Sequence, residues 1–163
     1  MTGLYGKLPA HGDFVRRRLP AELVAAFDGW AAAGLQAAEE RLGAASFAAR
    51  HDAMPCWCLA LPAGACGEQP VSGVLAPSRD AVGRRFFVLL AAPVMPPGED
   101  WFAALQQLAR RALAENWDAD RLAAALPAPS GESLASGWWH ATQDWPVPKL
   151  IPPEHVFQLL GTA

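Results

Sequence analysis

Apolar residues recur at helical spacing in two long stretches of the chain. The first stripe predicts a helix that begins at Pro20 and ends at Gly43. Its members are Leu23, Phe27, Trp30, Ala38 and Leu42. A second stripe predicts a helix that Glu99 and Asp100 open, with acidic residues where the helix dipole favours them. Its members are Trp101, Leu105, Leu108 and Ala112. Shorter helices are expected at residues 118–126, ended by Pro127, and at residues 153–160.

Three short apolar runs predict consecutive strands, because each ends in Pro and Gly-containing turns separate them. They are CWCLALP (56–62), VSGVLAP (71–77) and RFFVLLAAP (85–93). The turn-rich LPAHGD predicts a hairpin between residues 4–7 and FVRRR (14–18), and GWWHA (137–141) is expected to add an edge strand. Connections this short exclude parallel crossovers. The order therefore predicts one α/β (α+β) domain over residues 1–163, with a mainly antiparallel sheet of about five strands covered by helices.

Charge is unevenly distributed along the chain, whose formal net charge is −3. Seven of its 13 basic residues lie in two short segments. They are Lys7, Arg16, Arg17, Arg18, Arg79, Arg84 and Arg85. With Asp13 and Asp80 these segments carry +5, which leaves −8 for the rest of the chain. The net charge gives no reason to expect nucleic-acid binding, but two segments that meet would form a basic patch on an acidic body.

The three cysteines follow the spacing C-x-C-x7-C, and no histidine stands near them at ligand-like intervals. This pattern argues against zinc, and Cys56 and Cys58 suit buried thiols on one face of a strand. The N-terminal MTGLYGK lacks the apolar core of a signal peptide, and the longest apolar run, residues 86–94, is about half a membrane span. A cytoplasmic protein without direct membrane insertion is expected.

Motifs for phosphate or cofactor binding fail on spacing. Gly6-Lys7 is followed by Leu8 where a phosphate-binding loop needs Ser or Thr, and no G-x-G-x-x-G occurs. No cofactor and no metal are expected. The enzymatic alternative is a small serine hydrolase that uses Ser78. Its candidate partners are His11, His140, Asp13 and Asp80. Ser78 lacks a nucleophile elbow, and the mechanism requires its Oγ within hydrogen-bond reach of an imidazole in an open cleft.

Several polar and aromatic residues have expected structural roles. Gly12 would supply a positive φ or a close approach, and Asp13 would accept backbone N–H bonds in the turn or pair with Arg85 or Lys7. The three consecutive arginines at 16–18 would point alternately to opposite faces. One of Trp138 and Trp139 should be buried, and the other covered by the C-terminal helix or exposed as a contact anchor.

Four segments, taken together, resemble the TagF (ImpM) family of bacterial type VI secretion accessory proteins. They are GLYGKLPAHGDFVRRRLP (3–20), GVLAPSRDAVGRRFFVLLAAP (73–93), WW (138–139) and FQLLG (157–161). The residues that carry the resemblance are Gly6, Lys7, Leu8, Pro9, Gly12, Asp13, Phe14, Pro77, Ser78, Asp80, Val82, Gly83, Arg84 and Phe86. His11 departs from the pattern, since Arg or another polar residue is expected there. Some relatives carry an extra C-terminal segment or a fused PppA-type phosphatase, which is not expected here.

The resemblance implies a longin- or profilin-like sandwich and a post-translational repressor of type VI secretion that is not an enzyme. It implies binding to the forkhead-associated scaffold protein of the system, with membrane-complex components as further candidate partners. A longin-like adaptor of a GTPase is a third possibility, which rests on fold alone.

The site hypothesis is that the two cationic segments form one docking patch. Gly12 and Gly83 would set its turns, and Asp13 and Asp80 would orient the arginines. The alternative is that the motif residues pair with one another and only hold the hairpin to the sheet.

Overall fold

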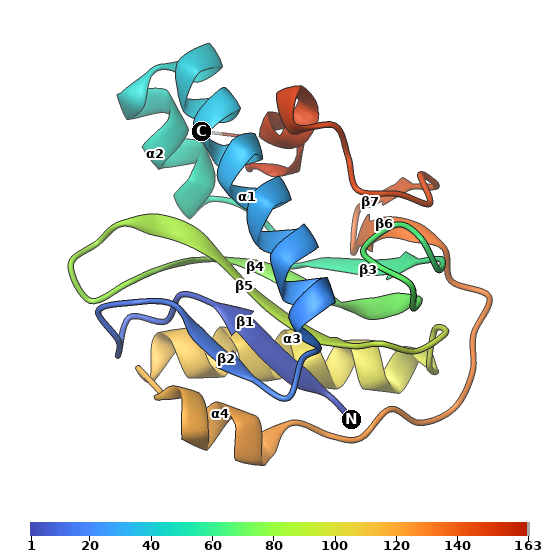
Figure 1. Ribbon diagram of the computed structural model, residues 1–163. Coiled ribbons are helices and arrows are strands. Elements are labelled where there is room, and N and C mark those ends of the chain that lie inside the picture. The colour runs from blue at the N-terminus through green and yellow to red at the C-terminus, as the bar shows by residue number, and fades with distance from the viewer. Residues whose placement is uncertain (163) are drawn as a thin grey trace.

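The computed structural model describes residues 1–162. Within that range the chain has a mixed α+β fold, with one antiparallel sheet of seven strands and five helices (Figure 1). The strands are β1 (Gly3–Gly6), β2 (Val15–Arg17), β3 (Trp57–Leu61), β4 (Val71–Arg79), β5 (Arg85–Ala92), β6 (Gly137–His140) and β7 (Gln143–Trp145). The helices are α1 (Ala21–Leu42), α2 (Ala44–Asp52), α3 (Glu99–Ala114), α4 (Ala119–Ala125) and the 3-10 helix η1 (Pro153–Leu159).

The strand order is β2-β1-β5-β4-β3-β6-β7, and every neighbouring pair is antiparallel. The three apolar runs form the central meander β3-β4-β5, and a hairpin adds to each side of it. The expectation of about five strands is therefore wrong in number. The prediction of an edge strand at GWWHA is corrected too, because β7 pairs outside β6.

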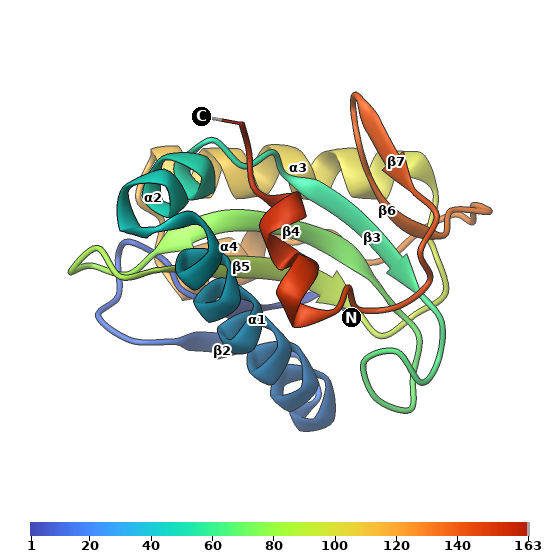
Figure 2. The ribbon, with the colours of Figure 1, turned by 90° about the horizontal axis from the view of Figure 1, so that it is seen from above.

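Alternate residues of the strands face two separate cores, which gives three layers. On β5, Phe87 and Leu89 belong to the core under α1 and η1. Val88 and Leu90 belong to the core over α3 and α4. Figure 1 shows α1, α2 and η1 on one side of the sheet and α3 and α4 on the other. Figure 2 shows η1 lying beside α1 above the sheet, where the two helices are in contact.

The long helices are confirmed close to their predicted bounds, since α1 follows Pro20 and stops before Gly43 and α3 begins at Glu99. Helix α2 was not predicted. It buries only Phe47 and His51, too few residues to mark a periodic stripe. No helix among residues 1–162 has both the length and the apolar character needed to cross a bilayer.

The segment after β7 is joined to the core through two buried tryptophans. Trp30 Nε1 donates to the carbonyl oxygen of Ile151 at 2.6 Å, and Trp57 Nε1 donates to that of Leu159 at 2.8 Å. Val156 fills the space above Gly34 of α1, where a Cβ would collide with its side chain. The C-terminal segment is therefore an integral part of the upper layer.

Candidate functional site

The two cationic segments meet at one end of the sheet. Pairing of β1 with β5 places the loop after β1 against the turn between β4 and β5, and both lie at the same end in Figures 1 and 2. Three hydrogen bonds join them. Ala81 N–H donates to the carbonyl of His11 at 2.8 Å, Ser78 Oγ to that of Lys7 at 2.6 Å, and Arg84 Nη2 to that of Gly12 at 2.9 Å. We call residues 9–14 and 79–84 together the paired-loop surface.

Asp80 is buried at the junction of the two loops and binds groups from both. Its carboxylate is 0% exposed and accepts the backbone N–H groups of Val82 at 3.1 Å and Arg84 at 3.0 Å. It also binds Arg84 Nε at 2.7 Å and Lys7 Nζ at 3.1 Å. Burial raises the pKa of this carboxyl, but the Arg84 backbone N–H and the two cations outweigh burial and hold its pKa well below the usual range. Asp80 therefore stays ionised and fixes the turn.

Lys7 lies inside the junction of the two loops. It is buried, and its Nζ lies 5.0 Å from the centroid of the Phe14 ring and 5.9 Å from that of Phe86. Cation–π contact and the Asp80 carboxylate together satisfy the ammonium group. Lys7 thus holds the two loops together and offers no free charge to a partner.

The outer side of the paired-loop surface combines exposed apolar groups with cations. Val82 is 73% exposed and Phe14 is 44% exposed, with the Phe14 ring fixed by stacking on Tyr5 and by an edge contact with Phe86. The Arg84 side chain is 63% exposed. Arg79 is exposed and forms no ion pair within residues 1–162. Aromatic and arginine side chains on a rigid support are typical of protein-binding surfaces.

Of the other arginines, Arg17 lies away from this surface, and Arg85, which stands opposite Arg79 in the β4–β5 pair, is neutralised by Asp52, so the predicted seven-cation patch is corrected. Arg17 Nε binds Asp120 of α4 at 2.8 Å, and Arg85 Nη2 binds Asp52 of α2 on the opposite face at 3.0 Å. Arg17 and Leu90 both pair with Leu4 of β1, so Arg17 lies level with Leu90. Leu90 is five residues from Arg85 along β5. That separation alone is about 17 Å.

The other two members of the arginine run are held by backbone oxygens. Arg16 Nε donates to the carbonyl of Leu19 at 3.2 Å, and Arg18 Nη1 donates to that of Ala123 at 2.9 Å. Arg16 stands opposite Tyr5, which faces α1, whereas Arg17 reaches α4. The expectation that the three arginines alternate between opposite faces is confirmed for Arg16 and Arg17 and wrong for Arg18, which has φ +64° and reaches α4 as Arg17 does. The same alternation prevents the run from forming one surface.

Of the expectations for the first loop, that for Gly12 is wrong and that for Asp13 is confirmed in its backbone alternative. Gly12 has neither a positive φ nor a close neighbour, because a Cβ there would meet nothing within 4 Å. The glycine with a special conformation is Gly6, with φ +139° and no room for a Cβ beside the carbonyl oxygen of Phe87. Asp13 accepts the N–H of Phe14 at 2.7 Å and pairs with neither Arg85 nor Lys7. Gly83 does set its turn, with φ +90°.

The comparisons with known proteins agree with the sequence motif. The model of the TagF N-terminal domain, described as type VI secretion system-associated, matches residues 3–128. The chain belongs to the TagF family. It is also similar to PA0076 from Pseudomonas aeruginosa PAO1, known from a crystal structure, with 29% identity and a TM-score of 0.74. That likeness covers 99% of this chain and 79% of PA0076. Among curated proteins none matches.

His11, the departure from the TagF pattern, connects the first loop to α4. Its Nε2 accepts the backbone N–H of Ala119 at 3.0 Å, at the first residue of that helix. The imidazole therefore acts as a cap for α4 in this member of the family.

Ser78 of this TagF domain is not arranged as a nucleophile. Its side chain is buried, and its hydroxyl donates to the backbone of Lys7. No imidazole hydrogen bond to Ser78 is found in the described part of the chain. His51 binds the carbonyl of Phe86, and His11 binds Ala119. The geometric requirement for the Ser78 hydrolase is therefore not met.

The cysteines behave as buried thiols. Cys58 and Cys66 are buried and Cys56 is half-buried, all three as free thiols. Burial raises the pKa of Cys56 and Cys58 to about 12 and that of Cys66 to about 11. Thiols with such pKa values stay protonated and unreactive at neutral pH. Residues 1–162 contain no group of three or more His, Cys, Asp or Glu side chains placed to hold a metal ion.

One of the two tandem tryptophans is buried and the other is partly accessible, as expected. Trp138 is fully buried in the core under α1, and its Nε1 donates to the carbonyl of Lys149 at 3.0 Å. Trp139 points to the α3 face and is half-buried against Phe102, with ring centroids 4.9 Å apart. Only the second tryptophan remains accessible at the surface of the TagF domain.

Proposed function

We propose that this TagF-family chain is a post-translational repressor of type VI secretion that acts without catalysis, by binding the forkhead-associated scaffold protein of the system. Membership of the TagF family supports the pathway. The observation that carries the mode of action is the concentration of family-motif residues at the paired-loop surface. Its buried members hold the loops, and its outer members form an exposed surface.

Phe14 and Val82 would be the apolar anchors of the contact, and Arg79 and Arg84 would bind carboxylates of the scaffold at its rim. Hydrogen bonds and the Asp80 ion pairs fix both loops before a partner arrives. A surface fixed in advance loses little conformational entropy on binding, which favours affinity. This arrangement reconciles the two sequence hypotheses, because the inner half of the motif is structural and the outer half is available to a partner.

The test uses two exposed changes that leave the loop framework intact. Val82→Asp and Arg79→Glu should each lower the affinity for the purified scaffold protein by about tenfold or more, as measured by calorimetry. Lys149→Glu is the matched control, since Lys149 is an exposed cation outside the paired-loop surface and makes no ion pair within residues 1–162. Melting temperatures of all three variants should equal that of the parent.

In cells, Val82→Asp should release secretion from repression and Lys149→Glu should not. The resemblance to TagF proteins also implies repression that is independent of the threonine kinase pathway, so treating the scaffold with phosphatase should leave its affinity unchanged. Parent-like binding by both Val82→Asp and Arg79→Glu would overturn the proposed surface. Absence of any binding by the parent chain would overturn the proposed partner.

A further inference from the structure

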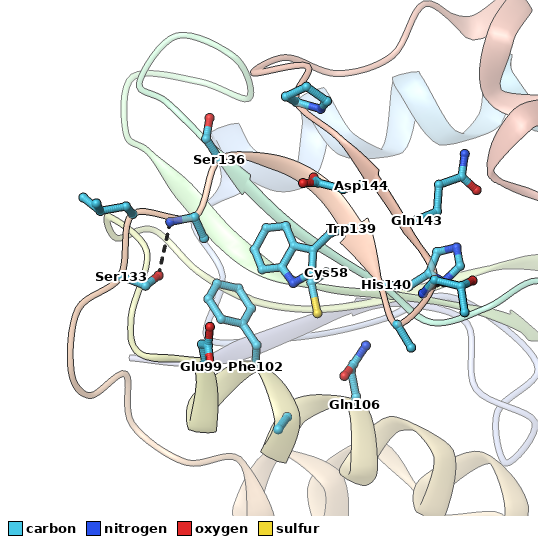
Figure 3. A pocket seen from close by; sticks show the side chains of 16 residues that line it. Cys58, Glu99, Phe102, Gln106, Ser133, Ser136, Trp139, His140, Gln143 and Asp144 are labelled. Atoms are coloured by element: carbon cyan, nitrogen blue, oxygen red, sulfur yellow. Dashed lines mark hydrogen bonds between the residues drawn. The ribbon is translucent and has the colours of Figure 1, made fainter.

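The lower face of the sheet is only partly covered by helices. Helix α3 packs on β4 and β5, and α4 packs on β2. Beside β3 and β6, α3 contributes only side-chain contacts, from Phe102 to Trp139 and from Gln106 to the carbonyl of Cys56. Cys58 of β3 and Trp139 of β6 point to it, beside the flank of α3. A groove results between α3 and the β6–β7 hairpin (Figure 3).

The groove is long and open. Two hollows of about 850 and 530 Å³ adjoin and share Cys58, Gln106 and Trp139 in their lining. The first reaches Glu99 and the second reaches Leu113. Fourteen helical residues separate these ends, a length of about 21 Å. Together the hollows exceed the roughly 300–1,000 Å³ of small-molecule sites and match the length of a helical segment.

The floor of the groove is apolar and fixed. Figure 3 shows Trp139 and Phe102 side by side at its centre, in an edge-to-face contact. Gln106 Nε2 donates to the carbonyl of Cys56 at 3.0 Å, so this amide is already occupied. Leu134, on the loop that borders the groove, is fully exposed. An exposed leucine and a half-buried tryptophan that line the same groove are typical of a contact surface.

Unpaired charges of opposite sign stand at the two ends of the groove. Glu99 lines one end, Arg110 lines the other, and Asp144 stands across from Trp139 in the first hollow. None of the three takes part in an ion pair within residues 1–162. An occupant that lies along the groove therefore meets an acidic end and a basic end, which sets its direction. The positive N-terminal end of a helix dipole suits the acidic end.

We propose that this groove binds an amphipathic helix of a partner protein. The bound helix carries an apolar stripe, basic residues in its first turn near Glu99, and acidic residues in its last turn near Arg110. Anchors at positions i, i+3 and i+7 contact Trp139, Phe102 and Leu134. This site is separate from the paired-loop surface, so it goes beyond the function proposed above.

The probes for the test are helical peptides of about 15 residues with leucine at i, i+3 and i+7. One peptide has Lys in its first turn and Glu in its last, and a second has these charges exchanged. Fluorescence anisotropy should show that the first binds about tenfold more tightly than the second. On Arg110→Glu this preference should disappear or reverse. Lys149→Glu is the matched control, because Lys149 is an exposed cation that makes no ion pair within residues 1–162 and does not line the groove.

A second pair of variants tests the position of the bound helix. Ala103→Trp fills the groove from an exposed position on α3 and should abolish peptide binding. Ala114→Trp lies on the same helix outside the groove and should leave binding unchanged. The proposal would be overturned if both peptides bound with dissociation constants above about 1 mM. It would also be overturned if the first peptide still bound the Ala103→Trp variant. Dimerisation that Ala103→Trp abolishes would overturn it too, because a second copy would then be the occupant.

Discussion

At the scale of single residues, Gly6 is the position of the first hairpin where a side chain is least tolerable. Its φ is +139°, and a Cβ would overlap the carbonyl oxygen of Phe87 on β5. Gly6→Ala should therefore lower the free energy of unfolding by roughly 3 kcal/mol, measured by urea denaturation. Gly12→Ala is the control and should change it by less than about 0.5 kcal/mol. Equal effects of the two changes would contradict this account of the loop.

Asp80 and Lys7 form the ion pair on which the paired loops depend. Asp80→Asn keeps an oxygen for the backbone N–H groups of the turn but leaves the buried Lys7 ammonium without its counter-charge. We expect the melting temperature of Asp80→Asn to fall clearly at pH 7. The double variant Asp80→Asn with Lys7→Met should recover most of the loss, because the unpaired buried charge is then removed.

The pH dependence of this pair follows from the lowered pKa of Asp80. The stability that it contributes is complete above the pKa of an unfolded aspartate, about 3.9, and is lost as the pH falls below that value. The difference in melting temperature between the parent and Asp80→Asn should therefore narrow from about pH 4 to pH 2. A difference that stays constant over this range would show that Asp80 contributes through shape and not through charge.

At the scale of elements, α2 is attached to the sheet through a neutral histidine. His51 Nε2 lies 2.6 Å from the carbonyl oxygen of Phe86, to which it donates. Burial lowers the pKa of His51 from its ordinary value of 6.5, against the opposing effects of the Phe86 carbonyl and Asp52. The unfolded chain therefore binds the proton more readily, and stability falls as the pH drops through 6.5.

His51→Gln keeps a donor for Phe86 and removes the titrating ring. Between about pH 7.5 and pH 5.5 the parent should lose more stability than this variant, in urea denaturation at several pH values. The other histidines are common to both proteins, so the difference isolates His51. Parallel pH profiles for the two proteins would refute this role.

Elements with a long apolar pattern could be predicted from the sequence, and short ones could not. The stripes of α1 and α3 each commit many residues to one face, and the apolar runs of β3, β4 and β5 bury residues on both faces of the sheet. Strand β7 has three residues, two of them exposed and one half-buried, so its sequence shows no alternation. Such a strand forms because β6 provides an edge for it, which is tertiary information.

At the scale of the whole molecule, the sequence predicted that the two motif segments meet. It did not predict which of their cations would be neutralised by carboxylates of other elements. The meeting follows from β1 pairing with β5, and the concentration of charge and of family-motif residues in the two segments had suggested it. The division depends on Asp52 and Asp120, which stand on α2 and α4 far away in sequence. Local charge density therefore overstated the basic patch, because the partners that neutralise it come from other layers.

The family match ends at residue 128, but the folded unit extends beyond it. Strand β6 pairs with β3, and the buried Nε1 groups of Trp30 and Trp57 donate to carbonyls of residues 151 and 159. A chain cut after residue 128 would expose the β3 edge and leave both indole donors without these acceptors. We expect this fragment to lose cooperative thermal unfolding and dispersed amide signals in NMR spectra. A fragment that melts cooperatively near the temperature of the full chain would instead show that residues 129–162 are an appendage, and the groove beside Trp139 would then belong to that appendage.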